Sequence, residues 1–71
     1  MTETDADELK RLGERLRKFR LENKYSQEKF SELVGLDRTY ISGLERGKRN
    51  PSFLIIKKLA AVLCIEPNQL F

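Results

Sequence analysis

The segment from Ser26 to Gly47, SQEKFSELVGLDRTYISGLERG, constrains the fold of this chain more than any other stretch. Ser26 and Asp37 belong to the residue types whose side-chain oxygen accepts a hydrogen bond from a free backbone N–H at the start of a helix. Gly35 and Gly47 supply the left-handed conformation that commonly ends a helix. Because these signals agree with one another, they predict two short helices joined by a tight turn.

Apolar residues in this segment predict that both helices face a common core. Tyr25 and Phe30 are spaced for a hydrophobic staple at the start of the first helix, and Leu36 and Ile41 repeat the spacing at the second. Ile41 and Leu44 lie on one face of the second helix. The opposite face carries small and polar side chains, namely Thr39, Gly43 and Arg46, with Ser42 beside them.

A longer helix is predicted before this segment, from about Asp5 or Ala6 to about Asn23. Its inward stripe is apolar at helical spacing and consists of Leu9, Leu12, Leu16 and Phe19. Residues 1–5 show no apolar periodicity, so we expect a flexible tail there and a single domain over residues 6–71.

A fourth helix is predicted from about Phe53 to Leu63, with Ser52 as its N-cap. Its expected core face is Phe53, Ile56, Leu59, Ala60 and Leu63. The remaining positions are largely apolar too, so this helix needs a second surface to pack against. Cys64 follows where glycine would end a helix more easily, and Pro67 suits the first position of a last short helix.

Composition excludes several classes of function. The chain has 71 residues, one cysteine and no histidine, so no internal disulfide is possible and most zinc sites are excluded. Without histidine, a cysteine pair or a glycine-rich phosphate loop, we expect neither an enzyme nor a cofactor site. A small domain without disulfides suggests a reducing cytoplasm. No apolar run reaches membrane-spanning length, and no signal peptide is visible.

The net charge of +3 is unevenly distributed. The chain starts with the acidic stretch TETDADE, whereas six cations lie between Lys10 and Arg20, and Lys48 and Arg49 form a second basic cluster. Such clusters are the electrostatic footprint of a nucleic-acid partner. For residues 10–20 taken alone, a solvated helix face remains the favoured interpretation.

From about Leu12 to Phe71 the chain resembles the Cro/repressor-type (Xre-like) helix-turn-helix family. The matching segments are LGERLRKFR, YSQEKF, VGLDRTYISGLERG, RNPS and KKLAAVLCIEP. The run LDRTYISGLERGKRN is most similar to the controller proteins of restriction–modification systems. Ser31, Leu33 and Cys64 depart from the common pattern, where alanine, a polar residue and glycine are usual.

The resemblance implies an all-α, compact five-helix bundle of the lambda-repressor-like DNA-binding type, with helices 2 and 3 as the helix-turn-helix. It implies a sequence-specific transcriptional regulator of double-stranded DNA, a repressor or an activator or both. By position, the residues facing the bases would be Arg38, Thr39, Tyr40, Ser42 and Gly43. Those on the DNA backbone would be Gln27, Arg46, Lys48, Arg49 and Asn50. Arg20 and Glu45 would form a structural ion pair.

The chemistry of these side chains fits such roles. Arg38 offers the two parallel donors that bind guanine, and Thr39 offers a methyl group or a hydroxyl. Tyr40 suits a phosphate or sugar contact, with packing on the preceding helix as an equal alternative. Gly43 weakens a helix; close approach of DNA is the favoured explanation, and a tolerated weakness is the alternative.

We also expect a homodimer on an inverted-repeat operator, because one small domain buries too little surface for high specificity. The predicted dimer interface is Leu54, Ile55, Val62, Ile65, Leu70 and Phe71. RNA polymerase would be a further partner at a promoter. The alternative is a protein-interaction module of the same fold, antitoxin-like or coactivator-like, with little direct base recognition.

Overall fold

The computed structural model describes residues 3–71, which form four α-helices and a 3-10 helix, with no strand among them. The elements are α1 (Glu3–Glu22), α2 (Gln27–Val34), α3 (Arg38–Glu45), α4 (Phe53–Leu63) and the 3-10 helix η1 (Pro67–Leu70). The predicted all-α class is confirmed. The predicted count of five α-helices is not, because Pro67 opens a single 3-10 turn instead of a fifth α-helix.

Helix α1 begins earlier than the sequence pattern indicates. Its first residue is Glu3, so residues 3–5 are helical and the tail expected there is wrong for those positions. Residues 1–2 of that tail lie outside the described residues. An amphipathic stripe predicts where a helix must pack, but it does not limit how far the helix continues beyond its packed turns.

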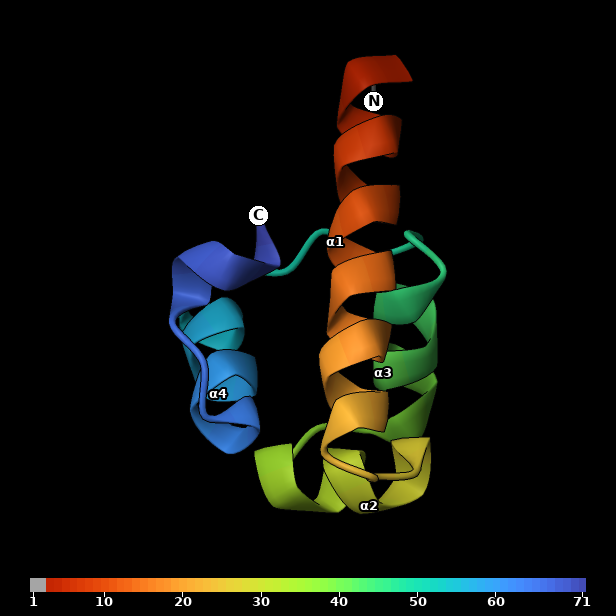
Figure 1. Cartoon of the computed structure of the whole chain (residues 1–71). Helices are drawn as coiled ribbons and strands as arrows, with labels where there is room; N and C mark the ends of the chain where they lie inside the picture. The colour runs from red at the N-terminus through yellow and green to blue at the C-terminus, as the bar shows by residue number, and fades with distance from the viewer. Residues whose placement is uncertain (1–2) are drawn as a thin grey trace.

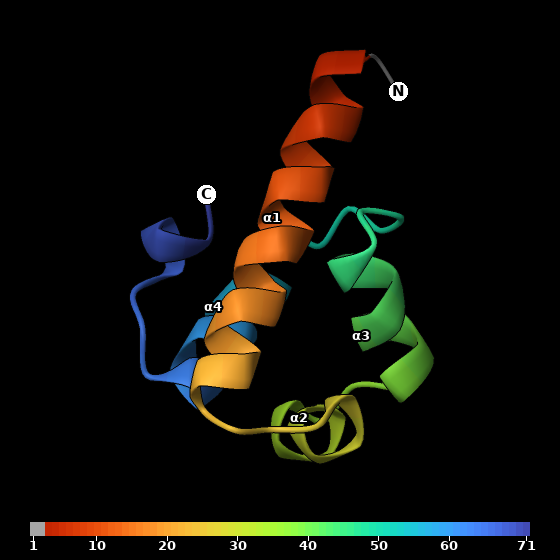
Figure 2. The same cartoon turned by 45° about the vertical axis from the view of Figure 1, so that its right-hand side comes forward.

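Helix α1 lies between α3 and η1, so α3 occupies one side of the molecule. Helix α1 contacts α3 on one side and η1 on the other, while α2 packs against both α3 and α4 (Figure 1). The N-terminal turns of α1 extend beyond the rest of the structure, and Figure 2 shows α2 and α3 as consecutive helices lying across each other. Helices α2 and α3 therefore have the helix-turn-helix arrangement expected from the sequence.

The predicted N-caps of α2, α3 and α4 and the predicted closing glycines of α2 and α3 are confirmed. Ser26 and Ser52 each accept a bond at Oγ from the amide three residues later, at 3.0 and 3.2 Å. Asp37 Oδ1 accepts from the amide two residues later at 2.7 Å. Gly35 and Gly47 adopt φ of 81° and 73°, the left-handed region that favours glycine. The N-cap hydrogen bonds and the left-handed glycines therefore fix the start and the end of α2 and α3.

The core is apolar and draws on every helix. The buried apolar residues are Leu9, Leu12, Leu16, Phe30, Ile41, Leu44, Ile56, Leu59, Ala60, Leu63 and Leu70. The staple between Tyr25 and Phe30 is formed, with ring centroids 6.3 Å apart. Gly13 lets α1 approach α3 closely, because a Cβ there would lie 2.3 Å from the carbonyl oxygen of Leu44.

Two predictions about the C-terminal region are wrong. Phe53, expected in the core, is 63% exposed, because it occupies the first turn of α4 and lies alongside Lys57 instead of the core. Leu70, expected in a dimer interface, is fully buried within the chain. The turn after α4 folds η1 back against α4 and α1, and this packing buries Leu70. Leu54 and Phe71 remain exposed.

Among residues 3–71, no helix combines the length and the apolar character needed to cross a lipid bilayer.

Candidate nucleic-acid interface

The N-terminal ends of α2 and α3 meet at the surface. Gln27, the first residue of α2, lines a shallow pocket of about 220 Å³ together with Arg38, Thr39 and Ser42 of α3. Arg38 and Thr39 are exposed, and the other two are half-buried. The structure thus brings together four of the predicted site residues. Between them they offer guanidinium, hydroxyl and amide donors within the first two turns of α2 and α3.

A buried ion pair sits behind this pocket. Arg20 donates from Nε to Glu45 Oε2 at 2.6 Å and from Nη2 to Oε1 at 3.0 Å, and its Nη1 donates to the carbonyl oxygen of Tyr25 at 2.8 Å. The two side chains are 8% and 4% exposed. The pair implied by the resemblance is therefore present, and it fixes α1 to α3 with two parallel bonds.

Gln27 extends this network to α2. Its Nε2 donates to Glu45 Oε1 at 3.2 Å, so one amide hydrogen is occupied by a protein partner. The family resemblance implies that Gln27 contacts the DNA backbone, and the structure adds that the same side chain is bonded to the buried pair. A side-chain amide carries two N–H donors, so the second one remains for an external acceptor.

The turn that follows α3 carries the second basic cluster, Lys48 and Arg49. Gly47 donates to the carbonyl oxygen of Leu44 at 3.1 Å, and Lys48 donates to that of Gly43 at 2.8 Å, which is the bonding pattern of a Schellman turn. Arg46 lies along α3, with its Nε donating to the Ser42 carbonyl oxygen at 3.3 Å. The turn keeps these cations beside α3.

Arg49 lies over α3 itself. Its Cζ is 5.5 Å from the centroid of the Tyr40 ring. Gly43 is buried, and a Cβ built on it would lie 3.0 Å from Arg49 Cγ. Gly43 was expected on the face that DNA approaches, and in this structure the Arg49 side chain lies over it.

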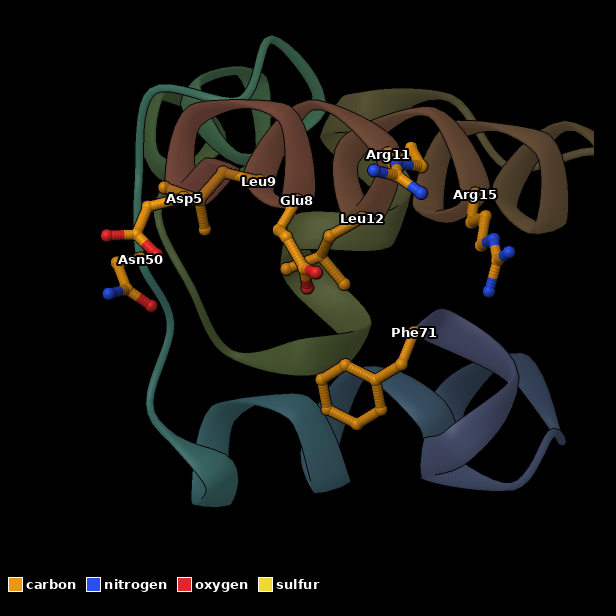
Figure 3. Close-up of a pocket in the computed structure, with 8 residues that line it drawn as sticks. All are labelled: Asp5, Glu8, Leu9, Arg11, Leu12, Arg15, Asn50 and Phe71. Carbon is orange, nitrogen blue, oxygen red and sulfur yellow. The ribbon is translucent and has the colours of Figure 1, made fainter. Parts of the chain in front are cut away.

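Asn50 is separated from the other predicted contacts. It lines a different pocket, of about 520 Å³, whose other residues are Asp5, Glu8, Leu9, Arg11, Leu12, Arg15 and Phe71. Figure 3 shows Asn50 beside Asp5 of α1, with the Phe71 ring on the other side of the pocket. Asn50 therefore lines the pocket beside α1 and not the pocket formed by Gln27, Arg38, Thr39 and Ser42.

Sequence reasoning missed the role of Gly13 in positioning the site. Its added Cβ would meet the carbonyl oxygens of Leu44 and Glu45 at 2.3 and 2.6 Å. Only glycine allows α1 to lie this close to the end of α3 that carries Glu45. A glycine inside the stripe formed by Leu9, Leu12 and Leu16 was the available signal, because glycine is unfavourable in a helix interior.

The arrangement suits an anionic, grooved partner. Four exposed cations, Arg38, Arg46, Lys48 and Arg49, follow α3 and its exit. The only carboxylate within α3 is Glu45, which is buried and paired. Among residues 3–71, no group of three or more histidine, cysteine or acidic side chains is placed to hold a metal ion.

Known proteins share this sequence and this fold. A helix-turn-helix family model (HTH_3) matches residues 16–70. Control protein C.MunI from a Mycoplasma species is 45% identical over 62 residues, covering 86% of this chain and 84% of that protein. The chain belongs to this helix-turn-helix family, and its predicted similarity to restriction–modification controller proteins is confirmed.

Solved structures of helix-turn-helix proteins are also similar to this chain in sequence and in fold. The restriction–modification controller protein C.AhdI from Aeromonas hydrophila is 51% identical with a TM-score of 0.86, covering 89% of this chain and 96% of that one. SinR, a master regulator for biofilm formation crystallised in complex with DNA, is 33% identical with a TM-score of 0.80, covering 83% of this chain and 95% of the crystallised chain. This chain spans 54% of the SinR sequence from Bacillus subtilis.

Proposed function

We propose that this DNA-binding transcriptional regulator recognises a specific operator by placing α3 in the major groove. The observation that carries the proposal is the exposed end of α3, where Arg38, Thr39 and Ser42 lie beside the start of α2. The major groove of B-DNA is about 12 Å wide and admits one α-helix. The buried Arg20–Glu45 pair supports the proposal, because it holds α3 rigidly behind that surface.

The side chains divide into base contacts and backbone contacts. Arg38 would bind guanine through its two parallel donors, and Thr39 and Ser42 would contact neighbouring base edges. The backbone contacts would be made by Gln27, Arg46, Lys48 and Arg49. Gln27 would use the amide hydrogen that Glu45 leaves available. Gly43 is not among the base contacts, since Arg49 covers it.

A homodimer on an inverted repeat follows from the size of the domain. A single recognition helix buries too little surface for high specificity, whereas two-fold pairing places two such helices about 34 Å apart, one turn of DNA. The proposed interface is the exposed and half-buried apolar surface of α4 and the C-terminal turn, without Leu70. It consists of Leu54, Ile55, Val62, Ile65 and Phe71. A sedimentation profile that stays monomeric at all concentrations, with and without DNA, would contradict it.

The names of the relatives suggest the biological role. C.MunI is a control protein and C.AhdI is a restriction–modification controller protein, and we infer the role of a restriction–modification controller here. Bound at a promoter, the dimer would repress by blocking RNA polymerase or activate by contacting it. Because only the dimer would bind the operator tightly, the fraction of operator bound would rise steeply as the protein concentration increases.

A protein-interaction module of the same fold is the second candidate. Leu33 on α2 is exposed, as are Phe53 and Leu54 on α4, and a protein partner would use such apolar side chains. The two candidates differ in their salt dependence, because binding through phosphates weakens steeply as salt rises.

The test is selection of bound sequences from a randomised duplex library near physiological salt, with Arg38→Ala and Arg15→Ala in parallel. Arg15 is an exposed arginine of α1 that lines the pocket near Phe71. Arg15→Ala therefore removes the same charge as Arg38→Ala, at a position away from α3. We expect an inverted repeat, and a loss of about 1–3 kcal/mol at one or two base positions for Arg38→Ala. Arg15→Ala should leave the preference unchanged.

Arg49→Ala should instead weaken binding to all sequences and flatten the salt dependence. Equal effects of Arg38→Ala and Arg49→Ala on operator and random DNA would contradict the assigned roles. An absence of any enriched sequence would favour the protein-interaction module.

A further inference from the structure

We infer that Gly43 and Tyr40 are positioning residues that hold the Arg49 side chain against α3 before DNA is bound. The inference rests on the proposed function, because it concerns how one cation of the DNA-facing surface is prepared for its phosphate. Three features of the structure lead to it: the turn after α3, the Tyr40 ring, and the missing side chain at Gly43.

The turn after α3 brings Arg49 back over the helix. The left-handed Gly47 reverses the chain, and the bond from Lys48 N to the Gly43 carbonyl oxygen, at 2.8 Å, closes the turn. Arg49 follows directly, so its backbone starts beside the last turn of α3. The side chain of Arg49 therefore meets α3 residues six to nine positions earlier in the sequence.

The Tyr40 ring provides an attractive surface for the guanidinium. Arg49 Cζ lies 5.5 Å from the ring centroid, within the range of a cation–π contact. Tyr40 is half-buried and packs against the core, so the ring itself is held in place. A fixed ring restricts a cation more effectively than a mobile one.

Gly43 provides the space for the aliphatic part of Arg49. The three atoms nearest to a Cβ built on Gly43 all belong to Arg49: Cγ at 3.0 Å, Nε at 3.4 Å and Cδ at 3.7 Å. Any larger residue would push this side chain outward. Glycine weakens a helix interior relative to alanine, so its presence in α3 calls for a compensating gain. Placement of Arg49 supplies one.

The gain for DNA binding is a smaller loss of freedom. Arginine has many rotamers, and ordering such a side chain at an interface costs affinity by about 2- to 10-fold. A guanidinium already held beside α3 avoids part of that loss. We therefore expect substitutions at Gly43 and Tyr40 to weaken binding through Arg49 and not through contacts of their own.

The first measurement uses the 71-residue protein in solution without DNA. A side chain stacked on an aromatic ring has its CγH₂ and CδH₂ proton resonances shifted upfield by the ring, so those of Arg49 should differ from those of Arg46. Tyr40→Phe keeps the ring and should preserve the shift, whereas Tyr40→Leu should abolish it. Arg49 resonances at ordinary arginine positions, or unchanged by Tyr40→Leu, would overturn the inference.

The second measurement is a double-mutant cycle on the selected operator duplex. Gly43→Ala and Tyr40→Leu are each made in the natural sequence and in an Arg49→Ala background. Each should weaken binding about 2- to 10-fold in the first background and have no effect in the second. Equal losses in both backgrounds would show that the substituted positions meet DNA directly, which overturns the inference.

Thermal unfolding separates placement from folding. Gly43→Ala should leave the melting temperature unchanged or raise it, because alanine favours the helix, while the affinity for DNA falls. A lower melting temperature in parallel with the lost affinity would assign Gly43 to stability alone. If the natural sequence binds no duplex, the proposed function fails, and the Tyr40-dependent shift still decides whether Arg49 is held as described.

Discussion

The helix-turn-helix half, α2 and α3, and the C-terminal half, α4 and η1, are organised by different kinds of information. In the first half each helix has an oxygen-bearing N-cap and a left-handed glycine after it, at the positions the sequence indicates. In the second half, the last element is a 3-10 turn, a cysteine replaces the closing glycine, and two apolar residues face unexpected environments. Local signals fix where a helix ends; packing decides which way a side chain faces.

The two halves are also attached to α1 by different chemistry. Helix α3 is joined to α1 by the buried Arg20–Glu45 pair and by the close approach at Gly13. The C-terminal turn is joined to the core by the fully buried Leu70. Substitutions at these residues test whether the polar and the apolar attachment contribute equally to the free energy of unfolding.

The largest effect is expected for Glu45→Ala. This change leaves the Arg20 guanidinium, 8% exposed, without its carboxylate, and an unpaired buried charge costs about 3–5 kcal/mol. The free energy of unfolding, measured with urea, reports the loss. Glu14→Ala removes an exposed carboxylate of α1 and should change stability by less than about 0.5 kcal/mol. A loss below about 1 kcal/mol for Glu45→Ala would mean that the pair behaves like a surface ion pair.

A loss of about 2–5 kcal/mol is expected for Leu70→Ala, because removing a fully buried leucine side chain leaves a cavity. Phe71→Ala, at the next position and 63% exposed, should change the stability of the monomer by less than about 0.5 kcal/mol. Urea unfolding at low protein concentration compares the two. If Phe71→Ala were the more damaging change, the observed direction of the C-terminal turn would be contradicted.

Much of the fold was predictable from sequence, and the errors share a cause. The caps at Ser26 and Asp37 and the closing glycines are set by contacts within four or five residues, so sequence patterns reveal them. The exposure of Phe53 and the burial of Leu70 depend on how α4 and η1 meet the rest of the chain. No helical wheel contains that information.

The candidate site shows the same division. The family resemblance assigned Gln27, Arg38, Thr39 and Ser42 to the DNA-facing surface. The structure brings them together, because all four lie in the first two turns of two capped helices. The sequence did not predict that Arg49 covers Gly43, since that contact requires the path of the chain after Gly47.

The smallest change in stability is expected at Cys64, which ends α4 at the position where glycines end α2 and α3. Cys64 ends α4 with φ of 57°. Its amide donates to the Ala61 carbonyl oxygen at 3.2 Å and that of Ile65 donates to Ala60 at 3.0 Å, the same pattern that Gly47 completes after α3. A residue with a side chain in the left-handed region destabilises the folded state by about 1–2 kcal/mol. Glycine avoids this strain, but it gives the unfolded chain more conformational freedom, which offsets part of the gain in stability. Cys64→Gly should therefore stabilise the protein by about 0.5–1 kcal/mol.

Gly35→Ala is the reciprocal change and its matched control. Gly35 has φ of 81°, and a Cβ added there would meet nothing within 4 Å, so the substitution isolates the backbone cost without a clash. It should destabilise by about 1 kcal/mol, opposite in sign to Cys64→Gly, in the same urea titration. Destabilisation by both changes would show that the exposed Cys64 side chain contributes contacts that outweigh its backbone strain. In that case α4 would end through packing and not through the local conformational preference that ends α2 and α3.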